Sequence, residues 1–429
     1  VARRVLDELE RGATSVLLDM SDVGIVDVDD LDAALDGVLL DIAAVVPSTA
    51  ADQVAAATAM LDLLARRGIS PDDAATTLGL DPIGRWATTA LGDVAADIAA
   101  TADVARRCAG DFPEVRSIVV DATVVHEAGG GDVDELAYAA SAGLEYVRAL
   151  IGAGLSIDDA FGQLEFRVAA TPDQFLTIAK LRAARRMWQR VASVSGAGED
   201  AQRQRQHAMS STAAASRYDV SVNLLRGTVE CFGAGVGGAD AVTILPHDEL
   251  LVTGGSDLGR RMCRNTQLVL IEESNLARVV DIAGGSWYVE QLTDQLATAA
   301  WDGLQEIERA GGLVDAVRQG VVQARVDATR ASRDEAIATR KMPMSGVTEF
   351  PNIADDIAEG RTGAPTAPAG DPSTAPFAPL RRHRYADPVE QQRRRADELA
   401  ASSGRPTVFL AAIGSTASNA ARVSFCLLY

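Results

Sequence analysis

Cysteine, histidine and long apolar runs are all scarce in this chain of 429 residues. Its four cysteines are scattered and form no CxxC pair, which argues against a disulfide framework and favours a reducing compartment, the cytoplasm. Its four histidines show no HxxxH arrangement and none has a cysteine at ligand spacing, so we expect no metal site. No apolar run approaches the roughly 20 residues of a membrane span. The residues concerned are Cys108, Cys231, Cys263 and Cys426, and His126, His207, His247 and His383.

Basic residues are also fewer than acidic ones. Forty basic residues against sixty acidic ones give a formal net charge of -20. That charge repels phosphate backbones and anionic membranes, so we expect no nucleic acid and no membrane as partner. The first residues, VARRVLDELERGATSV, are typical of an amphipathic helix rather than a signal peptide. Neither a P-loop nor a GxSxG motif occurs.

Short apolar runs, by contrast, recur regularly between segments with helical periodicity. Continuous Val, Ile and Leu runs separated by helices are typical of a parallel sheet buried on both faces. Eight such units favour an α/β fold of the (β/α)₈ type, a TIM barrel. The runs are residues 15–20, 37–46, 76–81, 117–125, 164–169, 205–212, 239–246 and 277–289.

The clearest helix signal lies in TPDQFLTIAKLRAARRMWQRV. Thr171 is the expected N-cap, with Pro172 in the first turn and Gln174 completing a capping box. Apolar residues then recur at steps of three and four, which predicts one stripe that packs on the barrel. These are Leu176, Ala179, Ala183, Met187 and Val191.

The amino-acid composition of the sequence changes near Gly346. We expect a barrel over residues 1–345 and a linker or belt over 346–404, which contains the Pro/Ala/Gly tract EGRTGAPTAPAGDPSTAPFAPL. Residues 405–429 begin a new strand and loop and then stop. Because the chain also starts in the middle of a helical pattern, we expect it to be a fragment.

Two motifs have plainer explanations than ligand binding. GAGVGG, residues 233–238, matches GxGxxG, but a helical segment precedes it and a strand follows, so a helix C-cap with a tight turn is the better interpretation. The acidic run DMSDVGIVDVDDLDAALDG lacks the ligand spacing of a calcium loop. Aspartates at the start of a solvated helix account for it.

His207 is the most interesting histidine. We expect RQHAMSST to end a barrel strand at the C-terminal face, where barrel enzymes bind substrates, with Arg205 on the same face. The alternative, a polar strand end that bonds only to its own loop, stays open at this point.

Several longer stretches resemble the methylmalonyl-CoA mutase family, the adenosylcobalamin-dependent acyl-CoA mutases. They include DELAYAASAGLEYVRALIGAGLSIDDAF, FLTIAKLRAARRMW, RNTQL, GGSWYVE and SGVTEFPN. The resemblance runs from about residue 10 to the end. It implies a barrel that threads acyl-CoA along its axis, capped by a C-terminal flavodoxin-like domain that carries cobalamin.

The chain departs from that family's catalytic pattern in the barrel. Thr123 and Val124 occupy the positions of a tyrosine-histidine pair, so the proton-donating histidine is missing. Gly79 replaces a substrate-contacting glutamine, and Thr243 stands where the family has a histidine. Bulky Val, Leu and Ile in the predicted strands should also fill the lumen.

The cobalt-ligand motif is altered in the last segment. The family's Asp-x-His-x-x-Gly reads TASNAA, with Thr416 and Ser418 in place of the aspartate and the histidine. The resemblance therefore implies that this chain supplies no protein ligand to cobalamin and binds no cofactor itself.

Within the family, the pattern resembles the small, non-catalytic subunit of the heterodimeric enzyme. That implies a catalytic large subunit as partner, which carries adenosylcobalamin and interconverts (R)-methylmalonyl-CoA and succinyl-CoA. Alternatives are an assembly or interaction protein of an acyl-CoA mutase, or a mutase acting on another acyl-CoA. We expect no catalytic residue in this chain. Weak, family-matched candidates for contacts with coenzyme A or adenosyl groups are Arg205, His207, Asn265, Gln267 and Glu273.

Overall fold

Parallel strands that follow one another in chain order form the centre of the structure, a computed structural model. It describes residues 1–428 apart from 22–24, 26, 50, 75, 253, 353–354, 356–374 and 405. Strands β3 to β7 make one parallel sheet, and β1 pairs with β2 in parallel. Their bounds are β1 Ser15–Asp19, β2 Ala44–Ser48, β3 Thr77–Leu80, β4 Arg116–Asp121, β5 Leu164–Ala170, β6 Gln206–Ser210 and β7 Ala241–Thr243.

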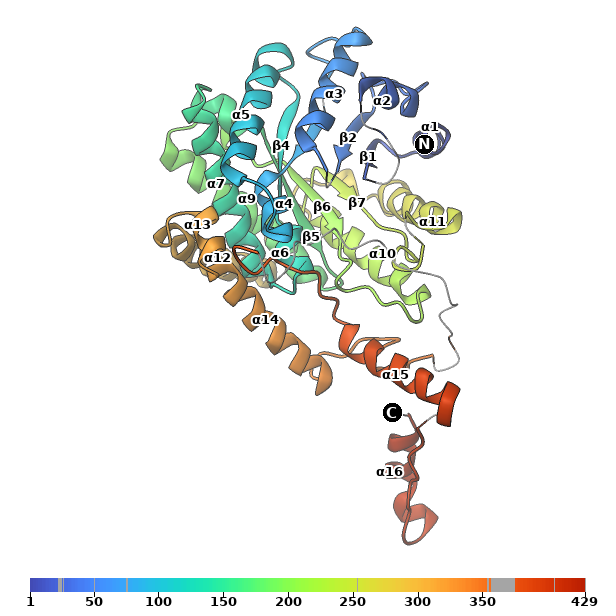
Figure 1. Cartoon of the computed structure of the whole chain (residues 1–429). Coiled ribbons are helices and arrows are strands. Elements are labelled where there is room, and N and C mark those ends of the chain that lie inside the picture. The colour runs from blue at the N-terminus through green and yellow to red at the C-terminus, as the bar shows by residue number, and fades with distance from the viewer. Residues whose placement is uncertain are drawn as a thin grey trace.

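Helices surround this curled sheet, which is consistent with a TIM-like barrel (Figure 1). The helices up to β7 are α1 Ala2–Glu10, α2 Val28–Ala34, α3 Gln53–Arg66, α4 Pro82–Thr89, α5 Val94–Asp111, α6 Thr123–Glu127, α7 Asp132–Gly152, α8 Ile157–Gly162, α9 Gln174–Ser195 and α10 Ser221–Val236. After β7 come α11 Asp257–Leu268, α12 Trp287–Arg309, α13 Leu313–Arg318, α14 Val321–Ala338, α15 Asp387–Ser403 and α16 Thr416–Leu428.

The eighth predicted strand, residues 277–289, is wrong. A short 3₁₀ turn covers Leu276–Arg278, and α12 begins at Trp287. Positive φ angles at Asp281 and Gly285 break an extended conformation between them. The apolar residues from Trp287 onward recur at helical rather than strand spacing. The described residues therefore contain seven of the eight expected strands.

Two other strand predictions were misplaced. The strand predicted at 37–46 is β2 at Ala44–Ser48, because Gly37 adopts a positive φ and turns precede it. The strand predicted at 117–125 stops at Asp121, whose carboxylate accepts a hydrogen bond from the backbone N–H of Thr123 at 3.0 Å. That Asx turn starts α6 instead.

Helix α9 confirms the predicted stripe but not the predicted cap. Ala179, Ala183, Met187 and Val191 are all buried. The N-cap is Asp173 rather than Thr171, and its carboxylate accepts from the backbone N–H of Leu176 at 3.1 Å. Both residue types are good caps, so the sequence alone did not separate them.

The glycine-rich segment 233–238 is a helix end, as expected. Helix α10 ends at Val236, Gly237 is its C-cap, and Gly238 has a φ of 78°. The glycines allow close packing, since a Cβ at Gly237 would meet Leu181 of α9. The acidic run likewise starts a helix, because Asp27 caps α2 by accepting from the backbone N–H groups of Asp29 and Asp30.

Part of the segment expected to be a belt lies along the barrel helices. The backbone N–H groups of Leu380, His383 and Tyr385 donate to the carbonyls of Ala87, Glu127 and Ala213, at 2.8, 2.7 and 2.8 Å. Figure 1 shows α15 beyond this contact and α16 extending away from the sheet. The Pro/Ala/Gly tract falls mostly outside the described residues, and residues 406–413 form no strand. No described helix is long and apolar enough to cross a membrane.

Gly79 on β3 lies close against the backbone of β2. Its φ is +74°, and a Cβ at this position would overlap the backbone carbonyl oxygen of Pro47 on β2. The position where the family resemblance expects a glutamine therefore has no room for any side chain.

We expect Gly79→Ala to lower the free energy of unfolding by about 2–4 kcal/mol, from left-handed backbone strain plus the overlap with Pro47. The control is Gly68→Ala, where φ is +65° but no atom lies within 4 Å of the added Cβ. That change should cost only about 1–2 kcal/mol. Equal losses in urea denaturation would contradict the close approach.

Candidate functional site

The alternation of β5 separates an outer face from an inner one. The ring of Phe166 packs against Trp188 of α9, with ring centroids 4.6 Å apart. Residues two apart share a face, so Glu165 and Arg167 point away from the helices into the interior. Both side chains are buried.

A row of polar side chains runs along the inner face of the sheet from β4 to β7. Asp121 and Arg167 are register partners, and Arg167 Nη1 lies 3.0 Å from Asp121 Oδ2. Arg167 is in turn the register partner of His207, and its Nε donates to His207 Nδ1 at 3.3 Å. His207 Nε2 lies 2.8 Å from Thr243 Oγ1 on β7. Three strand-to-strand contacts thus join four strands through their side chains.

Glu165 extends this network toward the beginning of the strands. Its Oε2 accepts from Thr77 Oγ1 of β3 at 2.9 Å and lies 3.6 Å from Arg205 Nε. Its Oε1 is 3.8 Å from His207 Nδ1. The interior between β3 and β7 is therefore occupied largely by polar and charged groups. This differs from the Val, Leu and Ile filling that the sequence indicated.

The hydrogen bonds fix the protonation state of His207. Because a guanidinium can only donate, Nδ1 must accept from Arg167, which leaves the proton on Nε2 facing Thr243. Burial, and then the charge of Arg167, lower the pKa of His207 to about 3. The imidazole is neutral with both nitrogens engaged, so it is poorly suited to acid catalysis. Arg167 Nη2 is buried without a hydrogen-bond partner among the described residues.

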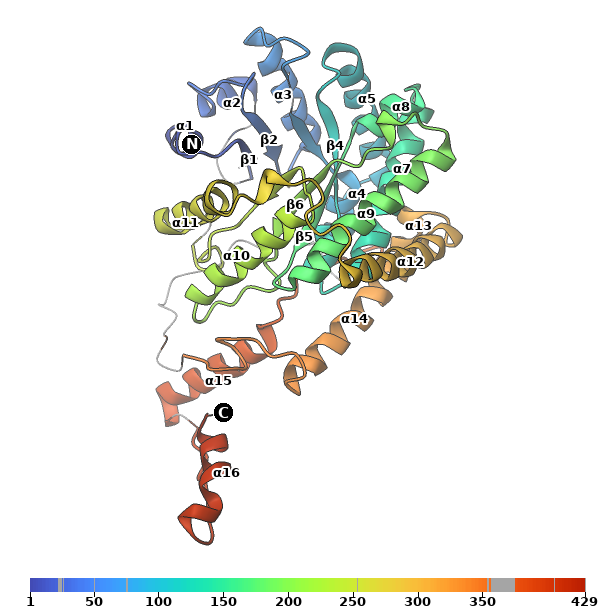
Figure 2. The same ribbon diagram turned by 180° about the vertical axis from the view of Figure 1, so that it is seen from behind.

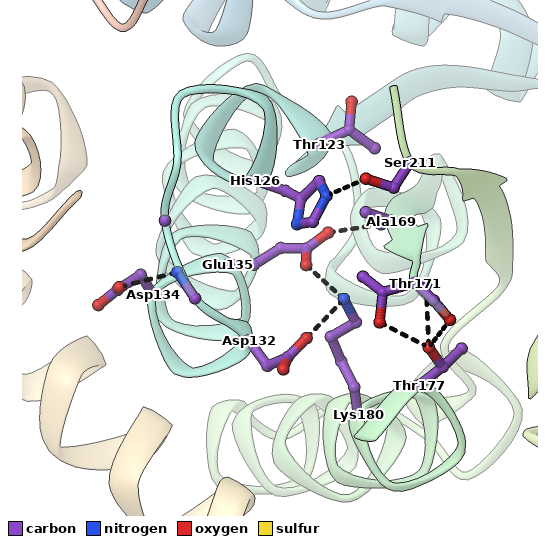
Figure 3. Close-up of polar contacts among 12 residues, drawn as sticks. Thr123, His126, Asp132, Asp134, Glu135, Ala169, Thr171, Thr177, Lys180 and Ser211 are labelled. Carbon is purple, nitrogen blue, oxygen red and sulfur yellow. Dashed lines mark hydrogen bonds and ion pairs between the residues drawn. The ribbon is translucent and has the colours of Figure 1, made fainter. Parts of the chain in front are cut away.

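A second buried cluster lies beside the C-terminal ends of β4 and β5 (Figure 3). Lys180 of α9 is fully buried and lies 2.8 Å from Asp132 Oδ1 and 2.6 Å from Glu135 Oε2. The second oxygen of Glu135 accepts from the backbone N–H of Ala169 on β5 at 2.5 Å. The cluster therefore ties the first turn of α7 to α9 and to the sheet.

Burial and pairing compete in this cluster. Burial raises the pKa of Glu135 to about 7 despite the neighbouring Lys180. Burial acts the same way on Asp132, but Lys180 outweighs it and holds the pKa of Asp132 below its usual value. His126 of α6 lies nearby and contacts Ser211 Oγ through Nε2 at 2.6 Å (Figure 3). Burial, with Lys180 adding to it, lowers the pKa of His126 to about 3.

The positions of the missing tyrosine-histidine pair carry no acid. Thr123 donates its hydroxyl proton to the Asp121 carboxylate, and Val124 packs partly buried against the hydrophobic core. His126, two residues further on, is turned to Ser211. The histidine closest in sequence to the position where the resemblance expects one is therefore engaged with Ser211.

The predicted site residues are divided between two parts of the molecule. His207 is the second residue of β6 and Arg205 precedes that strand, so neither lies at its C-terminal end as predicted. Asn265 and Gln267 lie on α11, and Glu273 lies in the π-helical turn that follows it. Helix α11 lies outside the strands (Figures 1 and 2). The five residues therefore do not converge on one site.

Sequence reasoning missed Arg167, Asp121 and the Lys180 cluster. One signal was available: Lys180 is one of only two lysines in the chain, and it directly follows Ala179 in the buried stripe of α9. A lysine there requires a buried carboxylate partner. Among the described residues, no group of three or more His, Cys, Asp or Glu side chains could hold a metal ion.

Comparison with known proteins agrees with the earlier resemblance. The sequence profile of the family described as methylmalonyl-CoA mutase matches residues 12–422. The chain belongs to the methylmalonyl-CoA mutase family. The resemblance seen in the sequence is thus confirmed over nearly its whole length.

The relatives carry a more specific name. A methylmalonyl-CoA mutase small subunit of Streptomyces virginiae is 48% identical over 98% of this chain and 66% of its own length. The small subunit of Propionibacterium freudenreichii subsp. shermanii is 42% identical over 99% of this chain and 64% of its own. A methylmalonyl-CoA mutase of Escherichia coli is 31% identical over 66% of this chain. The chain thus spans just under two thirds of the length of these two small subunits.

The neutral state of His207 gives a prediction on acid stability. Its pKa in the folded protein is about 3, below the roughly 6.5 of an unfolded histidine, so the unfolded state binds more protons between these values. We expect stability to fall as pH drops through this window. In His207→Gln the fall should be shallower by about 1 kcal/mol per pH unit, measured by urea unfolding from pH 6.5 to 4. Parallel curves for the two proteins would refute a neutral buried imidazole.

Loss of the Lys180 ammonium should be costly. Lys180→Met leaves Asp132 and Glu135 buried without their cation, and we expect the free energy of unfolding to drop by about 3–5 kcal/mol. The exposed Lys341→Met serves as control and should stay within about 0.5 kcal/mol of wild type. In the double variant Lys180→Met with Glu135→Leu, part of the lost free energy of unfolding should be recovered. A wild-type denaturation midpoint for Lys180→Met would contradict the pairing.

Proposed function

We propose that this chain is the small, non-catalytic subunit of a heterodimeric, adenosylcobalamin-dependent methylmalonyl-CoA mutase. Its partner is a catalytic large subunit that interconverts (R)-methylmalonyl-CoA and succinyl-CoA. The observation that carries this proposal is the row of contacts from Asp121 through Arg167 and His207 to Thr243 across the barrel interior. With these polar groups on the inner face of the sheet bound to one another, few donors or acceptors there remain free for an acyl thioester.

The reaction positions support the same proposal. An acid for the reaction is absent at Thr123 and Val124, and the backbone at Gly79 excludes a longer side chain. We propose that none of the family-matched candidates is catalytic, including Arg205 and His207, whose side chains belong to the interior network.

The last segment does not fit cobalamin. Ser418, at the position of the cobalt-ligating histidine, donates its hydroxyl to the carbonyl of Ser415 at 2.8 Å on the exposed α16. A neutral hydroxyl is not a replacement for an imidazole ligand. We therefore place the cofactor on the large subunit. Residues 405–429 then correspond to the start of a cobalamin-type domain that has lost its ligand, after a barrel over 1–345 and a linker over 346–404.

Two alternatives make different predictions. A mutase acting on another acyl-CoA would turn over its substrate alone. An assembly protein would associate with a mutase substoichiometrically. Cytoplasmic residence belongs to the proposal, because the substrates are coenzyme A thioesters and the cysteines are free.

The isolated chain, supplied with adenosylcobalamin and (R)-methylmalonyl-CoA, should form no succinyl-CoA. Thr123→Tyr with Val124→His should also remain inactive, because Val124 packs against the hydrophobic core and the chain still has serine at position 418, where the resemblance expects the cobalt ligand. Mixed with the large subunit, the chain should form a one-to-one complex, which light scattering would detect. That complex should have mutase activity. Turnover by the isolated chain would refute the proposal, and so would failure to bind the large subunit.

A further inference from the structure

A cavity of about 480 Å³ lies between α14 and the segment 375–381. Figure 1 shows the chain between α14 and α15 running back past α6 before α15 begins. A volume of this size falls in the range of small-molecule sites, roughly 300–1,000 Å³. We call this space the α14 cavity, and the helix lines it with Gln323, Val326, Asp327 and Arg330.

Both walls of the α14 cavity are held in place by contacts within the chain. The ring of Phe377 packs on Trp86 of α4, with ring centroids 4.3 Å apart. On the opposite wall, Gln323 Nε2 donates to the backbone carbonyl of Ala378 at 2.8 Å. Because these contacts exist before any ligand binds, a ligand would pay little entropy cost for ordering the cavity.

The residues that α14 contributes lie on one face of the helix. Positions 323, 326, 327 and 330 are three and four residues apart, which brings their side chains to the same side. From Gln323 to Arg330 the helix rises by roughly 10 Å. Gln323 thus lies at one end of this face and Arg330 at the other, with Val326 between them.

The middle of the α14 cavity is apolar. Val326 is only 1% exposed, and Ala128 at the end of α6 is buried as well. From the other wall, the buried side chains of Phe377 and Leu380 line the same space. An apolar body placed here would be removed from water on both sides.

The end at Arg330 is positively charged. Arg330 and Arg381 both line the cavity, against the single carboxylate of Asp327, which lies 2.8 Å from Arg330. The stem of Arg330 is fixed against Gly129, where a Cβ would come within 2.9 Å of its Cγ. Two guanidinium groups against one carboxylate leave a net positive charge, in a chain whose formal net charge is -20. This end therefore suits an anionic group.

The end at Gln323 lacks one hydrogen bond. Its Nε2 is used by Ala378, but its Oε1 is buried and has no partner among the described residues. Gln323 as a whole is 8% exposed. A buried carbonyl oxygen normally accepts a hydrogen bond, and a ligand hydroxyl or amine could donate it.

We infer that the α14 cavity binds an elongated small molecule with an apolar body, an anionic group at one end and a hydrogen-bond donor at the other. The anion contacts Arg330 and Arg381, the apolar body covers Val326, and the donor reaches Gln323 Oε1. The two polar ends of such a molecule are about 10 Å apart. The inference does not depend on the proposed function, because none of these residues belongs to the network in the barrel interior.

The test uses three probes with the full 429-residue chain: 8-hydroxyoctanoate, octanoate and octan-1-ol. The first has both polar ends, and each of the others lacks one. Arg330→Gln with Arg381→Gln changes one end of the cavity, and Gln323→Leu changes the other. The matched control is Arg186→Gln on α9, since Arg186 is also exposed and paired with an aspartate but does not line the cavity. Calorimetry gives the dissociation constants, and circular dichroism melting checks that each variant folds.

Wild type should bind 8-hydroxyoctanoate with a dissociation constant of roughly 1 mM or below. It should bind octan-1-ol about tenfold more weakly, and octanoate about fivefold more weakly. The arginine double variant should bind 8-hydroxyoctanoate about tenfold more weakly than wild type, whereas Arg186→Gln should stay within about twofold. Gln323→Leu should lose the preference for 8-hydroxyoctanoate over octanoate.

Three results would overturn the inference. They are unchanged affinity in the folded arginine double variant, equal wild-type affinity for 8-hydroxyoctanoate and octanoate, and no binding of 8-hydroxyoctanoate up to about 10 mM. If the double variant does not fold, Arg381→Gln alone gives the same comparison, because Arg381 is exposed. None of these results bears on the proposed function, which is tested by turnover and by binding of the large subunit.

Discussion

The buried ammonium group of Lys180 is the constraint on which the arrangement beside the C-terminal ends of the strands depends. A charge in that position is stable only with carboxylates close by, and Asp132 and Glu135 in the first turn of α7 supply them. Since Glu135 also accepts from the backbone of β5, the pairing holds α7, α9 and the sheet together. The glycine loop that precedes α7 has contacts of its own, because Asp134 accepts from the backbone N–H of Gly131 and Arg333 donates to the carbonyls of Gly129 and Gly130.

Deeper in the interior, the charges satisfy one another rather than a ligand. Asp121 neutralises Arg167, and the imidazole of His207 accepts from Arg167 while facing Thr243. In a barrel enzyme, such groups would keep some donors and acceptors free to hydrogen-bond a substrate. Arg167 Nη2 is one of several buried polar atoms that have no hydrogen-bond partner among the described residues. The interior therefore contributes specific packing and is poorly suited to recognition.

Sequence patterns predicted those features that depend on neighbours in the chain. The strands at β1, β3, β5, β6 and β7, the stripe of α9 and the glycine turn after α10 all have local periodic or steric causes. The eighth strand was wrong because a strongly apolar run, ARVVDIAGGSWYV, contains backbone positions with positive φ that its composition does not reveal.

The interior network could not be predicted in the same way. Arg167 lies within LEFRVA, where a charged residue in a strand is compatible with either face. Its inward orientation depends on Phe166 meeting Trp188 and on Asp121 and His207 arriving from other strands. Such pairings join residues about 40 or more positions apart, and composition and periodicity carry no information about them. Family resemblance identified the lost groups, but not what replaced them.

The contact between Gly79 and the carbonyl of Pro47 also bears on how such a chain could change over time. Because the carbonyl of Pro47 occupies the space where a side chain at position 79 would begin, substitution to the glutamine that the resemblance expects there would collide with the backbone of β2. Strand β2 would have to move away first, and that movement alone brings no activity. The non-catalytic role proposed above would therefore not be reversed by a single substitution at this position.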